Sequence, residues 1–459
     1  MTNRSTVLMT LKISRPSVGF RQRSPLALAI LSLALLVPLR FIGRADWLEF
    51  RGPFGDGHVS APGNTNLIGL PLHWDEKKNV RWKRPIPFHG QSTPVVLDRQ
   101  VWVTTATEEG NDLYAICVDA ESGEIIFNEL VFHTDKPESL GNGKGMNCYA
   151  TPTPVLEKGR IYVHYGSAFT ACLDTKTGTI LWKREDLHCR HYRGPSSSVV
   201  SFEDLIILTF DGADLQYVVA LDKKTGATVW NTKRSVAWND ENVPGQMARD
   251  GDLRKAHSTP VIVTANGKPM LLSAGAKAAY GYDPRTGREL WRVQYPDFST
   301  APRPLYDHGI AYFVTGMKNA EMIAVKTDGQ GDMTDSGIVW RVKNHIGRYS
   351  SPLLVDGLIY TAADEAFLTC LDASSGKVEW SERIGGKFAA SPIYADGRIY
   401  WFDRAGLTTV IKPGRELKII ATNKLDDEFM ASPAVSGKAL FLRTLTNLYR
   451  VESTTPESE

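Results

Sequence analysis

The sequence predicts an all-β fold, an eight-bladed β-propeller, from three observations. A hairpin phrase that ends in an aromatic residue recurs along the chain. A second signature, rich in Ser, Thr and Pro, occurs eight times. The last repeat lacks its final strand, and an unmatched strand near the N-terminus can supply it. Self-similarity at a spacing of roughly 40 to 60 residues is typical of solenoids, propellers and repeat arrays.

The hairpin phrase is clearest at 173–182, where an apolar strand, the turn Asp-Thr-Lys-Thr-Gly and a second strand ending in Trp182 follow one another. The same order recurs in three further segments and one degenerate copy: 221–230, 282–291, 371–380 and 118–127. The Asp side chain can bond the turn backbone, and Gly takes a positive φ without steric cost. Each copy is therefore predicted to be a β-hairpin whose turn fixes the strand register.

The second signature precedes the hairpins and begins an apolar strand. Its eight copies are Ser92-Thr93-Pro94, Pro152-Thr153-Pro154, Ser196-Ser197-Ser198, Ser258-Thr259-Pro260, Pro302-Arg303-Pro304, Ser350-Ser351-Pro352, Ser391-Pro392 and Ser432-Pro433. Each copy begins one strand and is followed by a second, and with the two strands of the hairpin every unit supplies four strands. No unit shows a convincing helical periodicity. Four-stranded units in series are typical of propeller blades. Small residues at the start of the first strand suit the crowded rim of a central channel.

The two ends of the chain complement each other. The eighth unit, 430–451, has three strands and is followed by a polar tail. The segment 79–82 resembles a fourth strand that carries the expected aromatic residue, Trp82. Pairing the two would close the ring and remove exposed strand edges. We therefore predict that the N-terminal strand completes the last blade.

One large aromatic residue stands at the same place in most units. A residue of this kind fills the space between neighbouring sheets most economically. We expect this blade-docking role, in preference to ligand stacking, for Trp82, Phe127, Trp182, Trp230, Trp291, Trp340 and Trp380.

The first 45 residues differ in composition from the rest of the chain. They hold seven Lys and Arg residues, no acidic residue and the apolar run 26–37. Together with the small-residue end at 43–45, this composition resembles a secretory signal peptide. Pro38 and Arg40 interrupt the run before it reaches the roughly 20 residues of a spanning helix, so a retained anchor is the second hypothesis. We expect export to the periplasm or cell envelope.

The predicted organisation is a signal peptide (1–45), an extension (46–78), one propeller (79–452) and a polar tail (453–459). The chain has 53 Lys and Arg and 51 Asp and Glu residues. Without the seven basic residues of the first segment, 46 and 51 remain, a formal charge of −5. Because nucleic-acid binding requires a basic excess on the folded domain, we expect no nucleic-acid partner. Membrane contact is expected only if the first segment is retained.

The cysteines divide into two groups. Three of them, Cys117, Cys172 and Cys370, fall at one repeat position and are expected to be small buried strand residues. Cys148 and Cys189 lie in the connections that enter successive blades. In an exported protein a disulfide between these two cysteines is plausible.

Two segments resemble metal sites only in part. The cluster His188-Cys189-Arg190-His191 offers ligands but no clear fourth one. The segment 328–335 is rich in Asp and Gly like a calcium loop, but lacks Gly at the sixth place and has Val339 where the bidentate Glu belongs. We predict a solvated loop in a widened hairpin there, and no metal site.

The connections between blades are the expected place for a binding site. Two of them, 128–149 and 231–256, are long, and long loops on a rigid ring often carry function. Basic or His residues in this register would form a positive funnel for an anionic ligand: His89, Arg193, His257, Arg303, Arg348 and Lys387. The alternative is ion pairing with acidic loop residues, namely Asp250, Asp252, Asp426 and Glu428.

The pattern Ala/Cys-x-Asp-x-x-Thr-Gly-x-x-x-Trp resembles the repeat of pyrroloquinoline quinone (PQQ)-type β-propellers, and the likeness covers 79–452. The chain also resembles exported bacterial PQQ-like repeat proteins similar to the outer-membrane assembly protein BamB. The opening motif, Trp47 to Gly57, and the closing repeat support that resemblance.

The resemblance implies two function classes. The first is a non-catalytic envelope propeller that binds or scaffolds a protein or peptide segment and needs no cofactor. The second is a quinoprotein dehydrogenase that uses PQQ and calcium to oxidise an alcohol or sugar. Quinoprotein alcohol dehydrogenases are known for an adjacent Cys-Cys pair, whereas no two cysteines here are neighbours, and no catalytic Asp matches a family motif. We favour the binding module and assign no catalytic residue.

Overall fold

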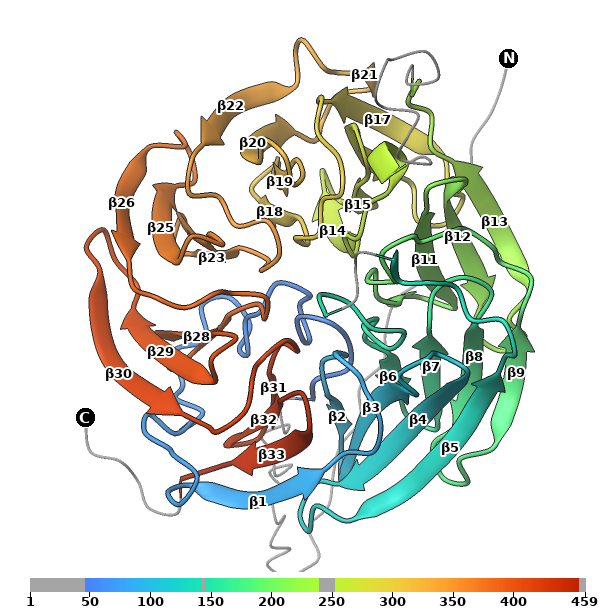
Figure 1. Ribbon diagram of the computed structural model, residues 1–459. Coiled ribbons are helices and arrows are strands. Elements are labelled where there is room, and N and C mark those ends of the chain that lie inside the picture. The colour runs from blue at the N-terminus through green and yellow to red at the C-terminus, as the bar shows by residue number, and fades with distance from the viewer. Residues whose placement is uncertain (1–45, 142–144, 239–251, 454–459) are drawn as a thin grey trace, which may run out of the picture. The chain divides into compact units, whose positions relative to one another are not determined.

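The computed structural model describes residues 46–141, 145–238 and 252–453. Within them, eight antiparallel sheets follow one another around a ring (Figure 1). Seven sheets contain four strands in chain order, one of them with an added parallel fifth strand, and the last sheet takes its fourth strand from the N-terminus. The prediction of an all-β, eight-bladed propeller is confirmed. The proposed signal peptide lies outside the described residues, and no helix in the described part of the chain is long and apolar enough to cross a membrane.

The blades are numbered in chain order, with the innermost strand of each given first. Blade 1 consists of β2 (Val95–Leu97), β3 (Gln100–Ala106), β4 (Asp112–Asp119) and β5 (Ile125–His133), and blade 2 consists of β6 (Val155–Glu157), β7 (Arg160–His164), β8 (Thr170–Asp174) and β9 (Ile180–Arg184). Blade 3 consists of β10 (Val200–Phe202), β11 (Leu205–Asp211), β12 (Gln216–Asp222) and β13 (Thr228–Lys233). Blade 4 consists of β14 (Val261–Ala265), β15 (Lys268–Ala274), β16 (Ala278–Tyr282) and β17 (Glu289–Gln294). A short 3₁₀ helix, η3 (Asp252–Arg254), precedes blade 4.

Blades 5 to 8 repeat the same plan. Blade 5 consists of β18 (Leu305–Asp307), β19 (Ile310–Val314), β20 (Glu321–Lys326) and β22 (Ile338–Lys343), and blade 6 consists of β23 (Leu353–Val355), β24 (Leu358–Ala362), β25 (Phe367–Asp372) and β26 (Val378–Arg383). Blade 7 consists of β27 (Ile393–Ala395), β28 (Arg398–Phe402), β29 (Leu407–Lys412) and β30 (Lys418–Lys424). Blade 8 consists of β31 (Ala434–Ser436), β32 (Ala439–Arg443), β33 (Asn447–Val451) and β1 (Val80–Pro85).

The N-terminal strand closes the ring as predicted. β1 pairs antiparallel with β33, with Trp82 opposite Arg450 and Pro85 opposite Asn447. The Glu452 N–H donates to Asn79 O at 2.8 Å and extends the pairing by one step. The two ends of the chain therefore share blade 8, as the adjacent blue and red strands of Figure 1 show.

The Ser, Thr and Pro signature forms a belt of hydrogen bonds around the axis. In six steps a backbone N–H of one blade donates to the hydroxyl of the equivalent residue in the next blade. These bonds are Thr93 N to Thr153 Oγ1 (3.0 Å), Thr153 N to Ser198 Oγ (3.0 Å), Ser198 N to Thr259 Oγ1 (2.9 Å), Arg303 N to Ser351 Oγ (3.0 Å), Ser351 N to Ser391 Oγ (3.0 Å) and Ser391 N to Ser432 Oγ (2.9 Å). Blade 5 has Arg303 at this position, which offers no hydroxyl acceptor.

The structure places most of the repeated Trp residues between neighbouring blades. Each of five indole N–H groups donates to a turn carbonyl of the next blade: Trp82 to Ala120, Trp182 to Lys223, Trp230 to Pro284, Trp340 to Ala373 and Trp380 to Gly414, at 3.0 to 3.1 Å. The turn glycine is needed for room as well as for its positive φ. A Cβ on Gly226 would lie 2.7 Å from the Trp182 ring.

Blade 4 departs from this pattern. Trp291 is buried against Phe313 and Met333, and its indole N–H has no hydrogen-bond partner among the described residues. The segment 328–335, predicted to be a solvated loop, is exposed over most of its length, but it is not wholly irregular. Its centre forms β21 (Gly331–Asp332), which pairs parallel to β17 and covers the outer edge of blade 4. In blade 1, Phe127 stands at the Trp position and stacks on Trp102 with ring centroids 5.8 Å apart.

The segment 47–58 crosses the end of the ring at the inner strands. Trp47 forms a β-bridge with Val96 of blade 1, and the Leu156 N–H of blade 2 donates to Leu48 O at 2.8 Å. His58 forms a bridge with Tyr394 of blade 7 on the other side. We call residues 47–58 the covering segment.

Arg51 fixes the covering segment from within. Its buried guanidinium donates to the carbonyls of Pro392 at 2.6 Å and Pro352 at 2.8 Å, in blades 7 and 6. Burial lowers the pKa of Arg51 to about 9, although nearby Asp56 opposes the shift. One side chain thus uses the carbonyls of two signature prolines as acceptors.

Candidate functional site

A cavity of about 160 Å³ lies on the axis at the N-terminal ends of the inner strands. The covering segment contacts the inner strands themselves, at Val96, Leu156 and Tyr394. Every blade or its entry loop contributes to the wall of the cavity, which we call the mouth cavity. It is lined by Gln91, Met146, Asn147, Thr151, Arg193, Ser196, His257, Ser299, Ala301, Met317, Tyr349, Ala389 and Met430.

Hydrogen bonds between entry loops hold this wall. The Gln91 N–H donates to Ala150 O at 3.0 Å, and Thr151 Oγ1 donates to Gln91 Oε1 at 3.2 Å. Asn147 Nδ2 donates to Arg193 O at 2.9 Å, which joins the loops that enter blades 2 and 3. Because the loops are bonded to one another, the cavity is a preformed feature of the ring.

His257 is the most unusual polar residue of the wall. Its backbone N–H donates to Thr300 O at 2.8 Å, which holds the residue between blades 4 and 5. The side chain is buried, and its Nδ1 atom has no hydrogen-bond partner among the described residues. Burial, followed by the charges of Lys255, His191 and Arg193, lowers the pKa of His257 to about 3. At neutral pH the imidazole is therefore uncharged in a basic environment.

Aromatic rings support the cations beside His257. The Arg193 guanidinium lies 5.5 Å from the centroid of the Tyr192 ring. The ammonium of buried Lys255 lies 5.9 Å from the same ring and 5.7 Å from that of Phe298. Cation–π contacts of this length stabilise a partly desolvated charge. They let two cationic side chains stay near the mouth cavity with little water around them.

The structure brings together only part of the predicted positive funnel. Arg193 and His257 line the mouth cavity. Arg348 lies beside it: its Nη1 donates to Met317 O at 3.0 Å, and its Nη2 lies 2.8 Å from the Asp364 carboxylate. Arg348 thus lies next to the cavity, as the predicted positive funnel requires, and also forms an ion pair with an acidic residue, as the alternative prediction requires.

The other three predicted residues lie elsewhere. Exposed His89 forms a β-bridge with Ala106. Lys387 borders a separate open depression that includes Asp364 and Glu365. Arg303 is a correction, because its guanidinium points to the covering segment and donates to Phe50 O and, at 3.1 Å, to Glu49 Oε1.

The acidic residues named for the alternative also need revision. Glu428 forms an ion pair with Arg404 at 3.6 Å, whereas Arg348 pairs with Asp364 and Glu365, which were not predicted. Asp250 lies outside the described residues. Sequence reasoning also missed Tyr349 of the cavity wall, whose pKa is raised by burial and then by Asp364, against the opposing charges of nearby arginines that include Arg348 and Arg193. The signal that could have found Tyr349 is its position, directly before the signature of blade 6.

The proposed disulfide is absent from the structure. Cys148 and Cys189 are both free thiols. Cys148 Sγ lies 3.6 Å from Thr151 Oγ1, and Cys189 Sγ lies 3.5 Å from His191 Nε2. Burial raises the pKa of each of these two thiols, so neither is an activated nucleophile.

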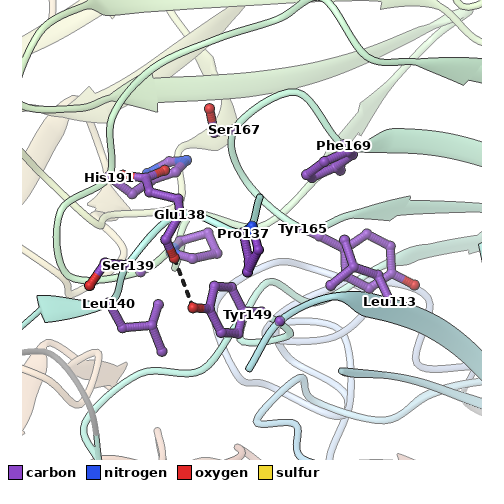
Figure 2. A pocket seen from close by; sticks show the side chains of 13 residues that line it. Leu113, Pro137, Glu138, Ser139, Leu140, Tyr149, Tyr165, Ser167, Phe169 and His191 are labelled. Atoms are coloured by element: carbon purple, nitrogen blue, oxygen red, sulfur yellow. Dashed lines mark hydrogen bonds between the residues drawn. The ribbon is translucent and has the colours of Figure 1, made fainter. Parts of the chain in front are cut away.

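A second, smaller pocket of about 30 Å³ lies between the entry loops of blades 2 and 3 (Figure 2). Tyr149 Oη donates to Glu138 O at 2.8 Å, and the Tyr192 N–H donates to Glu138 Oε1 at 3.0 Å. Burial raises the pKa of Glu138. The volume suits one or two water molecules and no larger ligand. This pocket therefore supports the loops that carry Asn147 and Arg193.

The described residues offer a poor fit to PQQ and calcium. They contain no group of three His, Cys, Asp or Glu side chains that could hold a metal ion. The mouth cavity, at about 160 Å³, is also smaller than the roughly 300 Å³ at the lower end of pockets that enclose a drug-sized ligand. It is large enough for one side chain of a partner.

Comparison with known proteins gives a family and a fold. The family model described as outer membrane protein assembly factor BamB matches residues 114–266, 214–332 and 332–415. Together these matches cover more than half of the 459 residues.

Individual relatives match over part of their length. Tetrathionate hydrolase of Acidithiobacillus ferrooxidans is 24% identical over 301 residues, which are 64% of this chain and 48% of that protein. Outer membrane protein assembly factor BamB of Yersinia pestis is 23% identical over 261 residues, 56% of this chain and 60% of that protein. The chain thus spans about half to three-fifths of these relatives.

A solved structure shares the architecture. The quinohemoprotein alcohol dehydrogenase of Comamonas testosteroni has a TM-score of 0.64 at 13% identity, over 90% of this chain and 82% of that one. At this identity the likeness shows the fold alone.

Proposed function

The chain belongs to the family described as outer membrane protein assembly factor BamB, and from this premise we propose that it is a non-catalytic propeller of the cell envelope that binds a segment of a partner protein at the mouth cavity. Scaffolding of an envelope protein is the corresponding role. Fold likeness alone would not decide this, since the same architecture hosts unrelated functions.

The observation that carries the proposal is that one end of the ring is covered by the chain itself and the other end has a cavity. One end carries the covering segment, which is tied to the inner strands by backbone pairing and by Arg51. The other end carries a mouth cavity walled by residues of every blade. A rigid ring with a small cavity on the axis suits a protruding side chain or loop of a partner.

The alternative is a PQQ-dependent dehydrogenase. The small cavity and the lack of a three-ligand metal cluster among the described residues support the binding module over this alternative. The hydrolase relative, which this chain spans by less than half, does not supply a catalytic residue that we can place.

Site-specific photocrosslinking tests the binding proposal. A benzoylphenylalanine at Ala389, in the wall of the mouth cavity, should give an adduct with an envelope protein in native host cells. The same probe at exposed Phe54, in the covering segment, is the matched control and should not give that adduct. Adducts at neither position, or the same adduct at both, would contradict the proposal.

Calorimetry addresses the alternative with the purified chain. Titration with PQQ, with and without calcium, should show no saturable binding. Saturable binding that an Arg193→Ala, Arg348→Ala variant loses would instead support the dehydrogenase.

A further inference from the structure

We propose that the outer strand of blade 1 pairs edge to edge with the same strand of a second copy of this chain, antiparallel and centred on Asn128. This strand, β5, lies on the circumference of the ring (Figure 1), whereas the mouth cavity lies on the axis. The inference therefore goes beyond the proposed function and does not depend on it.

The outer edge of β5 is open in the described part of the chain. β5 is the last strand of its sheet and pairs with β4 on its inner side alone. Blade 4 differs, because β21 adds a parallel strand to the outer edge of β17. The outer edge of a blade can thus accept a further strand. An open edge presents unpaired N–H and C=O groups to another chain.

The strand also lacks the charges that protect the other outer strands. Each of these seven carries at least one Lys or Arg, and such residues resist edge-to-edge pairing: β1, β9, β13, β17, β22, β26 and β30. β5 is the longest outer strand, with nine residues, and has neither Lys nor Arg. It exposes three large aliphatic side chains, Ile125, Ile126 and Leu130, more than any other outer strand does. β5 is therefore the outer strand best suited to pair with another chain.

The sequence of β5 is self-complementary about Asn128, which favours a second copy as the occupant. In an antiparallel pair with a two-fold axis at Asn128, each Ile126 lies opposite the Leu130 of the other copy. These three residues are exposed, whereas Phe127 and Glu129 between them are half-buried. Each Glu129 lies opposite a Phe127 in this register, so no two carboxylates face each other. The pairing thus brings four exposed aliphatic side chains together without opposing like charges.

The paired stretch is short. Ile126 and Val131 have no opposite residue in β4, and these two bulges confine the regular part of β5 to Phe127–Leu130. A contact of this length is small beside the roughly 800 Å² per partner of a standard stable interface. We therefore expect a reversible dimer, with the chain monomeric at about 1 μM and mostly dimeric at about 1 mM.

Sedimentation equilibrium of the full chain over this concentration range tests the proposal. The average mass should rise from that of one chain toward twice that value. A variant with both Ile126→Lys and Leu130→Lys should stay monomeric, since it gives β5 the charges that the other outer strands carry. Val229→Lys, at an exposed aliphatic residue of β13, is the matched control and should associate like the parent chain. Unfolding curves establish that each variant folds.

Charge variants at Asn128 test the register, and they do so even if the double lysine variant does not fold. Asn128→Lys alone and Asn128→Glu alone should each weaken association by about threefold or more, because two like charges would lie opposite each other. An equimolar mixture of the two variants should associate at least as strongly as the parent chain, since opposite charges then meet at the two-fold axis.

Three outcomes would overturn the inference. They are a monomeric parent chain throughout the range, equal association of the parent and a folded double lysine variant, and a mixture of the Asn128 variants that associates no better than either one alone. The crosslinking result is independent, because an adduct at Ala389 in a chain that stays monomeric would leave the proposed function standing and remove this inference. A β5 dimer without an adduct at Ala389 would do the reverse.

Discussion

The guanidinium of Arg303 lies 3.1 Å from the carboxylate of Glu49 and joins blade 5 to the covering segment. Arg303 stands where most blades place the hydroxyl residue of the belt around the axis. Its Nε also donates to Pro260 O at 3.0 Å, so the same side chain bridges to blade 4. Arg303 thus breaks the belt between blades 4 and 5, and the same residue fastens the segment that covers the ring.

Replacement of Arg303 by Met should destabilise the folded chain by about 2–4 kcal/mol. The change leaves Glu49 and the carbonyls of Phe50 and Pro260 without their donor, and loss of one partner of a buried pair is costly. Chemical unfolding measures the change, and hydrogen exchange should rise first in residues 47–58. Arg285→Met, which removes a surface pair with Glu203, is the control and should stay within about 0.5 kcal/mol of the parent. Equal effects of the two substitutions would refute the role of Arg303.

A buried ion pair between Arg234 and Asp211 lies within blade 3, and its Arg234 also reaches blade 4. The two side chains meet at 2.6 Å, and Arg234 also donates to Ser273 Oγ at 2.9 Å. Arg234→Met alone should cost about 3–5 kcal/mol because Asp211 would remain buried without its partner. Adding Asp211→Leu should recover a large part of that loss. A double-mutant cycle by urea unfolding measures the coupling, and additive losses would show that the two charges act independently.

Closure by β1 can be tested by moving the strand. A circular permutant that begins at Ile86 and carries residues 79–85 after Val451, joined by a copy of the turn Asp222 to Thr228, keeps the pairing of β1 with β33. It should fold with a midpoint close to that of the unpermuted chain starting at residue 79, which has the same strands in the original order. The same permutant without residues 79–85 should lose cooperative unfolding, because blade 8 would expose an unpaired edge and blade 1 would lose the Trp82 contact. Similar unfolding of both permutants would show that the pairing of β1 with β33 contributes little to the stability of the ring.

The sequence predicted the ring but only part of its two ends. Strand number and closure follow from local patterns, such as the Asp-x-x-x-Gly turn whose glycine meets the Trp ring of the preceding blade. The direction of a side chain at the axis does not follow from such patterns. Arg193 and Arg303 occupy similar places near the blade entries, yet one lines the mouth cavity and the other reaches the covering segment. That difference depends on which acceptors the folded ring places nearby, and sequence spacing does not encode it.

Buried neutral histidines should make the protein less stable in mild acid. Burial lowers the pKa of His164 to about 3, whereas a histidine in the unfolded chain titrates near 6.5. Between these values the unfolded state binds a proton that the folded state does not. Stability should therefore fall as the pH drops below about 6.5, by about 1.4 kcal/mol per pH unit for each such histidine. His191 and His257, whose pKa values burial also lowers, act in the same direction.

His164→Gln should remove one share of this pH dependence. The Gln side chain can still bond Thr170 Oγ1, which lies 2.9 Å from His164 Nδ1, but it takes up no proton. The loss of stability between pH 7.5 and pH 5 should then be smaller than in the parent chain by about 2 kcal/mol. Urea unfolding at the two pH values measures the difference, with His308→Gln at an exposed side chain as the control for the substitution. An unchanged pH dependence in His164→Gln would mean that His164 accepts a proton within the folded blade, which its burial between Thr170 and Phe210 opposes.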